Sequence, residues 1–180
     1  SLGCLRRDGM RHIFGLDYGY TNDPTAFIAA AVDEANKRLY IYDEYYETKM
    51  LNHDIAAMII RKGYQKERIR ADSAEPKSND DLRRLGIGRI SPARKGADSV
   101  TAGIARLQEY RILVHPRCVH TAAELGAYCW QSGTREGQFI NRPVDRDNHL
   151  MDALRYAMED APTAPKEAPK TRRRVPVITP

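Results

Sequence analysis

The chain has 180 residues, 42% of them hydrophobic and 29% charged, which suits one globular domain with its own core. No apolar run approaches the roughly 18 to 20 residues of a membrane span, and no segment has the order of a signal peptide. Residues 162–180 hold five Lys or Arg and one Glu, so the rest of the chain carries only +1 of the net +5.

Three segments are therefore expected. Residues 1–11 are polar and basic and are interpreted as a linker, residues 12–161 as the folded domain, and residues 162–180 as a flexible tail. The tail contains five prolines, which favour extended chain. The three cysteines form no CxxC pair, and this odd number indicates free thiols in a reducing compartment.

The first half of the folded part predicts an antiparallel meander followed by a helix. Alternating or continuous apolar runs with short connections predict three strands, over 12–20, 24–32 and 38–47. Leu51, Ile55, Met58 and Ile59 then recur at helical spacing, and Gly63 is a plausible helix stop.

Strands and helices then alternate to the end of the domain. Short strands are predicted over 68–73, 88–92 and 111–115, and helices over 76–85, 97–110 and 118–130. Residues 131–143 read as a polar loop or hairpin, and Asp147 or Asn148 can cap a last helix that runs through Met158. The pattern predicts a mixed α/β sheet in which a right-handed crossover places 68–73 beside the first strand.

Acidic residues stand at three places in this pattern. Asp17 lies in the first strand, where a carboxylate is unusual, and Asp72 ends the fourth strand, with Glu75 one turn later. His149 and Asp152 are three residues apart on the last helix and therefore share a face. Ligands of open α/β sheets tend to bind at the carboxyl ends of the strands.

Three carboxylates packed together would repel one another, and hard divalent ions such as Mg²⁺ or Mn²⁺ relieve that repulsion. Two such ions can activate water and stabilise a leaving oxygen in phosphodiester hydrolysis. We therefore expect Asp17, Asp72 and Asp152 to bind metal. Each also has a simpler interpretation, as a buried ion-pair partner, a helix cap and an exposed helix residue respectively. His149 is either an active-site residue or a packed histidine. Glu75 and Asp145 are either solvated or placed behind the residues that bind the metal directly.

Four stretches together resemble the C-terminal nuclease domain of a tailed-phage terminase large subunit, in order over residues 12–159. They are "FGLDYGYTNDPTAF", "ADSAEPKS", "ARKGADSV" and "DNHLMDALRYAM". The resemblance implies an RNase H-like fold, flanked by helices, with the sheet order 3-2-1-4-5. It also implies cleavage of double-stranded DNA, the phage genome concatemer, with two divalent metals during packaging.

By the same resemblance Asp17, Asp72 and Asp152 bind metal and His149 has an accessory role. Lys77, Lys95 and Ser99 fall in segments that could meet DNA phosphates. The implied partners are DNA, an N-terminal packaging ATPase domain, the small terminase subunit and the portal, with the host bacterial cytoplasm as the location. The chain has no GxxxxGK[ST] motif, so ATP-driven translocation is not assigned to it.

Alternatives remain open from the sequence. "GLDYGYTND" also resembles the phosphate-binding hairpin of sugar kinases and Hsp70-like ATPases, although no later Gly-rich adenosine loop follows. Another RNase H-like nuclease, of resolvase or integrase type, and a non-catalytic DNA-binding or docking module are further hypotheses. His115, Cys118, His120 and Cys129 offer four zinc ligands, but their spacing fits no common finger, and the cysteines read as core residues.

Overall fold

The computed structural model describes residues 9–94, 96, 99–127, 130–132, 139–143 and 148–162. Most of the predicted linker and nearly all of the predicted tail lie outside these ranges. Two of the candidate site residues, Lys95 and Asp145, lie outside them as well.

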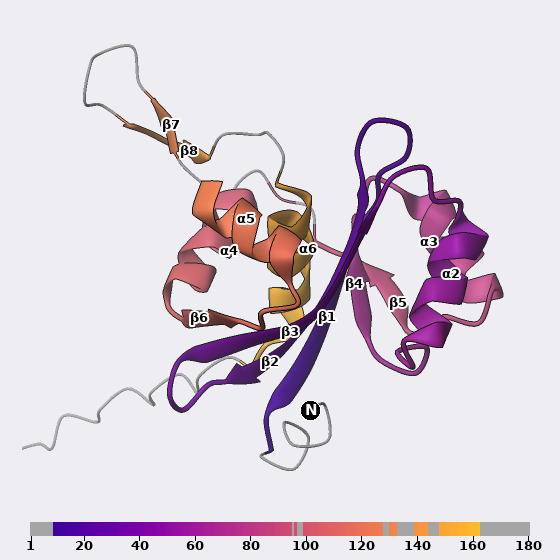
Figure 1. Cartoon of the computed structure of the whole chain (residues 1–180), viewed down its shortest axis with the longest axis horizontal. Coiled ribbons are helices and arrows are strands. Elements are labelled where there is room, and N and C mark those ends of the chain that lie inside the picture. Colours follow the sequence, from indigo (N-terminus) through magenta and orange to yellow (C-terminus); the bar gives the residue numbers. More distant parts are fainter. Residues whose placement is uncertain are drawn as a thin grey trace, which may run out of the picture.

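A six-stranded sheet forms the centre of the molecule (Figure 1), in the order β5-β4-β1-β2-β3-β6. Its strands are β1 (Arg11–Asp17), β2 (Thr25–Asp33), β3 (Arg38–Glu47), β4 (Ile69–Ala71), β5 (Ile90–Pro92) and β6 (Arg111–Val114). The first three pair antiparallel, while β4 pairs parallel with β1 and β5 parallel with β4. The predicted order 3-2-1-4-5 is confirmed, and β6 extends it by pairing parallel with β3.

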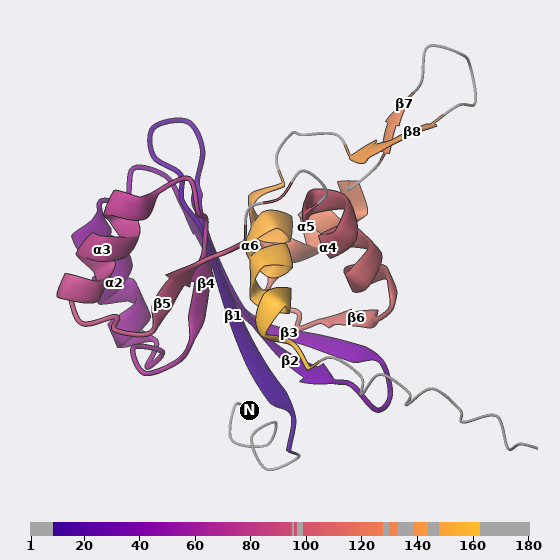
Figure 2. The same cartoon turned by 180° about the vertical axis from the view of Figure 1, so that it is seen from behind.

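Helices cover both faces of this sheet (Figures 1 and 2). Two of them, α2 (Asn52–Arg61) and α3 (Pro76–Arg84), pack with one face around Phe14 and Phe27. On the other face lie α4 (Ser99–Gln108), α5 (Val119–Ala127) and α6 (His149–Ala157), which is followed by a short 3₁₀ turn, Met158–Asp160. Because β2 is covered on both sides, it is a continuous buried run without polar alternation.

Several predicted boundaries are wrong by a few residues. The first strand ends at Asp17 instead of residue 20, because the chain turns at Gly19, whose amide and carbonyl both hydrogen-bond the Thr25 hydroxyl. The predicted helix over 118–130 ends at Ala127, and Trp130 begins a strand instead. That strand, β7 (Trp130–Ser132), pairs with β8 (Phe139–Pro143), which confirms the hairpin alternative for this region.

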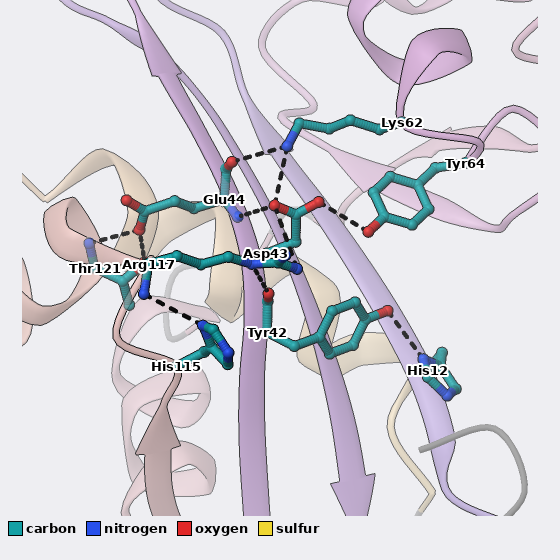
Figure 3. Close-up of polar contacts among 9 residues, drawn as sticks. All are labelled: His12, Tyr42, Asp43, Glu44, Lys62, Tyr64, His115, Arg117 and Thr121. Atoms are coloured by element: carbon teal, nitrogen blue, oxygen red, sulfur yellow. Dashed lines mark hydrogen bonds and ion pairs between the residues drawn. The ribbon is translucent and has the colours of Figure 1, made fainter. Parts of the chain in front are cut away.

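A bulge in β3 fastens both helical layers to the sheet (Figure 3). The register places Tyr42 as an extra residue, and its carbonyl accepts a 2.7 Å hydrogen bond from Arg117 Nε. Asp43 accepts hydrogen bonds from Lys62 Nζ and the Tyr64 hydroxyl, both at 2.9 Å, and thereby holds the end of α2. None of the described helices is long and apolar enough to span a bilayer.

Candidate functional site

Two of the predicted aspartates lie side by side at one edge of the sheet. Asp17 is the last residue of β1, and Asp72 directly follows β4, its parallel neighbour. The Asp72 amide continues the ladder by donating a 3.0 Å hydrogen bond to the Leu16 carbonyl. Asp17 is thus at the carboxyl end of its strand, where open α/β sheets bind ligands, and not in the middle of it.

Helix α6 brings the third aspartate to the same edge by crossing β1 at Gly15. The Ala153 carbonyl oxygen lies only 1.8 Å from where a Gly15 Cβ would be, so only glycine permits this approach. At the start of α6, His149 Nδ1 lies 3.1 Å from Asp17 Oδ2. Asp152 follows one turn later on the same helix.

Burial and like charges make Asp17 an unusual carboxylate. Its side chain is only 11% exposed, and its pKa is raised from 3.8 to about 6, with desolvation as the largest cause. The negative charges of Asp152 and Asp72 contribute to this rise, while the hydrogen bond with His149 opposes it. The same hydrogen bond raises the pKa of His149. Asp72 and Asp152 are therefore both close enough to act electrostatically on Asp17.

Two of the three carboxylates are turned toward other partners. Asp72 Oδ1 accepts a 2.9 Å hydrogen bond from the Ala74 amide. Asp152 Oδ1 accepts two hydrogen bonds from Arg155, at 2.9 Å from Nη2 and 3.2 Å from Nε. In this arrangement no three His, Cys, Asp or Glu side chains of the described residues lie close enough to enclose an ion.

The chemistry of the donors nevertheless fits a hard divalent cation. The three groups are all carboxylates, and the negative charges of Asp152 and Asp72 contribute to the raised pKa of Asp17 after the larger effect of desolvation. Asp72 and Asp152 are half-buried. Rotations of exposed or half-buried side chains take place on the picosecond to nanosecond scale and require no change of fold.

Sequence reasoning missed the residue that supports the Asp72 loop. Asn79 of α3 is 2% exposed, and its Nδ2 donates to the carbonyls of Asp72 at 3.0 Å and Glu75 at 3.1 Å. Its Oδ1 accepts a 3.1 Å hydrogen bond from the Tyr18 hydroxyl, directly after Asp17. A single asparagine thus ties together the chain segments that follow β1 and β4.

A second missed residue is Glu124 of α5. Asn148 occupies the predicted N-cap position of α6, but its side chain makes no capping hydrogen bond. Instead, Glu124 Oε2 accepts hydrogen bonds from the amides of Leu150 at 2.9 Å and Met151 at 3.0 Å. Asn148 thus has the predicted position but not the capping hydrogen bond, which a carboxylate from a neighbouring helix supplies; Asp147, the other predicted cap, lies outside the described residues.

The other predicted residues that the structure describes lie at the starts of two helices, α3 and α4. Glu75 and Lys77 are exposed at the start of α3, and Glu75 accepts a hydrogen bond from Ser78. Ser99 begins α4 and lines a cleft of about 530 Å³ together with Arg94 and Arg155.

The zinc interpretation receives no support from the described residues. Cys118 is fully buried in the core, as the sequence predicted. His115 accepts a hydrogen bond from the Arg117 amide, and His120 stacks on Tyr46 with ring centroids 4.6 Å apart. Cys129 lies outside the described residues.

The raised pKa of Asp17 predicts that Asp17→Asn stabilises the metal-free protein at high pH. The folded protein holds this proton more tightly than the unfolded chain, so wild-type stability falls as pH rises from 3.8 through about 6. Asparagine cannot ionise and avoids that loss, which is roughly 1 to 3 kcal/mol above pH 7. Urea unfolding in EDTA should show this gain at pH 8 and little gain at pH 4.

Asp80→Asn is the matched control, because Asp80 is an exposed carboxylate on α3. Its stability should change by less than about 0.5 kcal/mol at either pH. An Asp17→Asn protein that is less stable than wild type at pH 8 would contradict the electrostatic description of this site.

A family comparison now identifies the type of domain. The profile of the terminase RNase H-like domain matches residues 17–160, which include α6 and all three aspartates. The chain belongs to the terminase RNase H-like family. This membership confirms the family resemblance drawn from the sequence and decides against the kinase, resolvase and integrase alternatives.

Two relatives of this terminase domain are large terminase subunits. The large subunit of Bacillus phage SPP1 is 40% identical over 157 residues, covering 86% of this chain and 36% of that protein. The PBSX phage terminase large subunit of Bacillus subtilis strain 168 is 33% identical over 147 residues, covering 81% of this chain and 34% of that protein. The chain thus spans about a third of the length of these relatives.

Solved terminase nuclease domains have the same fold. The SPP1 large-terminase nuclease domain, a crystal structure with bound Mn, superposes with a TM-score of 0.78 at 38% identity, covering 83% of this chain and 85% of that one. The P22 large-terminase nuclease domain gives a TM-score of 0.66 at 19% identity, covering 84% and 82%. The mixed RNase H-like sheet predicted from the sequence is therefore confirmed.

Proposed function

We propose that this domain is a metal-dependent endonuclease that cleaves double-stranded DNA, the phage genome concatemer, during packaging. The observation that carries the proposal is the convergence of Asp17, Asp72 and Asp152 from β1, β4 and α6 at one edge of the sheet. Structural roles for the three residues would not require three acidic side chains to gather where their charges repel. A site for cations accounts for all three together.

Asp17, Asp72 and Asp152 would hold two Mg²⁺ or Mn²⁺ ions. When bound, such ions activate a water molecule and stabilise the leaving oxygen in phosphodiester hydrolysis. The manganese in the SPP1 nuclease domain, 38% identical to this chain, supports the choice of a divalent cation. Cations near Asp17 would also return its pKa toward the ordinary range and keep the carboxylate ionised at neutral pH.

The remaining polar residues would position these carboxylates. His149 hydrogen-bonds Asp17 Oδ2 and fixes the orientation of that carboxylate, and its Nε2 lies 3.9 Å from Asp23 on the loop after β1. Arg155 holds Asp152 and balances its charge until cations bind. Both residues act on the ligands, so they would affect the rate less than the aspartates do.

The wider role follows the longer relatives, whose names identify them as terminase large subunits. We propose that the domain acts with an N-terminal packaging ATPase domain, the small terminase subunit and the portal, in the host bacterial cytoplasm. Because the folded part carries little net charge, its DNA contacts would be weak and would depend on phosphates and metal.

Metal dependence is the direct test of this function. Supercoiled plasmid incubated with the purified chain should be nicked and linearised with Mn²⁺ or Mg²⁺ and stay intact in EDTA. The expected rate ratio is at least about 1000-fold, since bound ions would activate the attacking water and stabilise the leaving oxygen.

Cleavage that persists in excess EDTA would rule out the two-metal mechanism. A folded protein that binds DNA but cuts it with neither ion would instead support the non-catalytic docking module. Protein purified in parallel from cells with an empty vector controls for a contaminating nuclease.

A further inference from the structure

Among the described residues, a side chain of another helix, α5, holds the start of α6. The first amides of a helix have no partner within it and need an outside acceptor. Asn148 does not provide one, and Glu124 Oε2 accepts from both the Leu150 and the Met151 amides. Glu124 itself is only 8% exposed, so water does not readily replace it.

This contact is part of a chain of two carboxylate caps that leads from the sheet to the site. At the start of α5, Glu44 of β3 accepts a hydrogen bond from the His120 amide at 2.9 Å. It accepts another from the Thr121 amide at 2.8 Å (Figure 3). Three residues after Thr121, Glu124 caps α6. The first residue of α6, His149, then contacts Asp17 of β1.

We propose that Glu124 is a positioning residue of the nuclease site: its carboxylate fixes the first turn of α6 and so holds His149 and Asp152 in place beside Asp17. The amides that it caps belong to the two residues between His149 and Asp152. This inference rests on the metal-dependent function proposed above.

The cap has features that an ordinary structural contact would not need. A buried carboxylate is costly, and Glu124 Oε1 has no hydrogen-bond partner among the described residues. The charge is balanced in part by the positive end of the α6 dipole. It also lies close enough to act electrostatically on both His149 and Asp152. A group that orients metal ligands from behind typically changes metal affinity or activity 10- to 100-fold when it is removed.

The test uses Mn²⁺ binding in the absence of DNA, measured by electron paramagnetic resonance of free Mn²⁺. Glu124→Ala leaves both α6 amides without an acceptor, so its Mn²⁺ affinity should fall roughly 10- to 100-fold. Glu124→Gln can still accept both hydrogen bonds through its carbonyl oxygen and should lose less than about fivefold. With saturating Mn²⁺, Glu124→Ala should lower kcat for plasmid cleavage and leave KM for DNA unchanged.

Two controls separate positioning from general loss of stability. Glu109→Gln removes an exposed charge that pairs with Lys37, away from α6. Ile59→Val loosens the core on the opposite face of the sheet, around α2. Both should bind Mn²⁺ as wild type does, at a temperature at which circular dichroism shows every variant to be folded.

Equal Mn²⁺ affinity in wild type and Glu124→Ala would overturn the positioning role. If Glu124→Ala does not fold, Glu124→Asp replaces it, since it keeps the charge but is one methylene too short to reach the amides. Wild-type affinity in Glu124→Asp would overturn the inference just as directly. Failure of the wild-type protein itself to bind Mn²⁺ would refute the proposed function, and is recognised before any variant is measured.

Discussion

Replacing Asp17, Asp72 or Asp152 singly by Asn is expected to lower the rate of metal-dependent plasmid cleavage at least about 1000-fold, or about 4 kcal/mol of activation free energy. Each substitution removes one charged oxygen donor, and the remaining two carboxylates cannot hold a pair of divalent ions. The fold should persist, because two of these side chains are partly exposed and the third is destabilising when ionised. Cleavage assays and circular dichroism on the same preparations check both statements.

His149→Ala should be milder, with a loss of about 10- to 100-fold, because the three aspartates can still bind metal without it. Asp80→Asn should cleave at the wild-type rate, since Asp80 is an exposed carboxylate on α3. An aspartate variant that keeps near-normal cleavage would remove that residue from the site. A loss in His149→Ala equal to that of the aspartates would make His149 a primary catalytic residue.

Gly15→Ala is expected to be strongly destabilising although it adds only one methyl group. The added Cβ would lie 1.8 Å from the Ala153 carbonyl oxygen and 3.2 Å from the Ala157 Cβ. The Ala153 carbonyl belongs to the backbone of α6 and cannot rotate away as a flexible side chain can. Helix α6 would therefore have to shift away from β1. We expect a loss of about 3 to 5 kcal/mol in stability, a large part of the total for a domain of this size.

Gly88→Ala provides the matched control, because nothing lies within 4 Å of a Cβ at that position. It should change the free energy of unfolding by less than about 0.5 kcal/mol. Thermal and urea unfolding of both variants decide the matter. A Gly15→Ala protein with wild-type stability would mean that α6 does not cross β1 as closely as described.

The sequence predicted the fold and singled out three acidic residues as candidates, because both inferences rest on local pattern. The meander of β1, β2 and β3 follows from apolar runs with short turns, and β4 joins β1 through a right-handed crossover. Asp72 and Asp152 stood out because one ends a strand and the other shares a helix face with His149. Their mutual approach could be argued from topology alone, and the charge interactions agree with it.

The supporting residues could not be predicted, because their partners are distant in sequence. Asn79 in "SNDD" and Glu124 in "AAEL" have no local feature that separates them from solvent-facing helix residues. Both are buried only because another segment folds over them. Gly15 did carry a signal, since a glycine inside a strand often marks close backbone approach. The place of β6 beside β3 likewise depends on long-range pairing.

The order of the proposed ligands along the chain has a consequence for biosynthesis. Asp17 and Asp72 lie at the ends of strands that are translated early. Asp152 and the amides capped by Glu124 lie on α6, the last of the described helices. A nascent chain can therefore complete the meander and the crossover to β4 before the proposed metal site is assembled. Domains acquire structure from the N-terminal side as the ribosome delivers them. Nuclease competence would thus appear in a single late step, when α6 emerges from the ribosome and docks on Gly15.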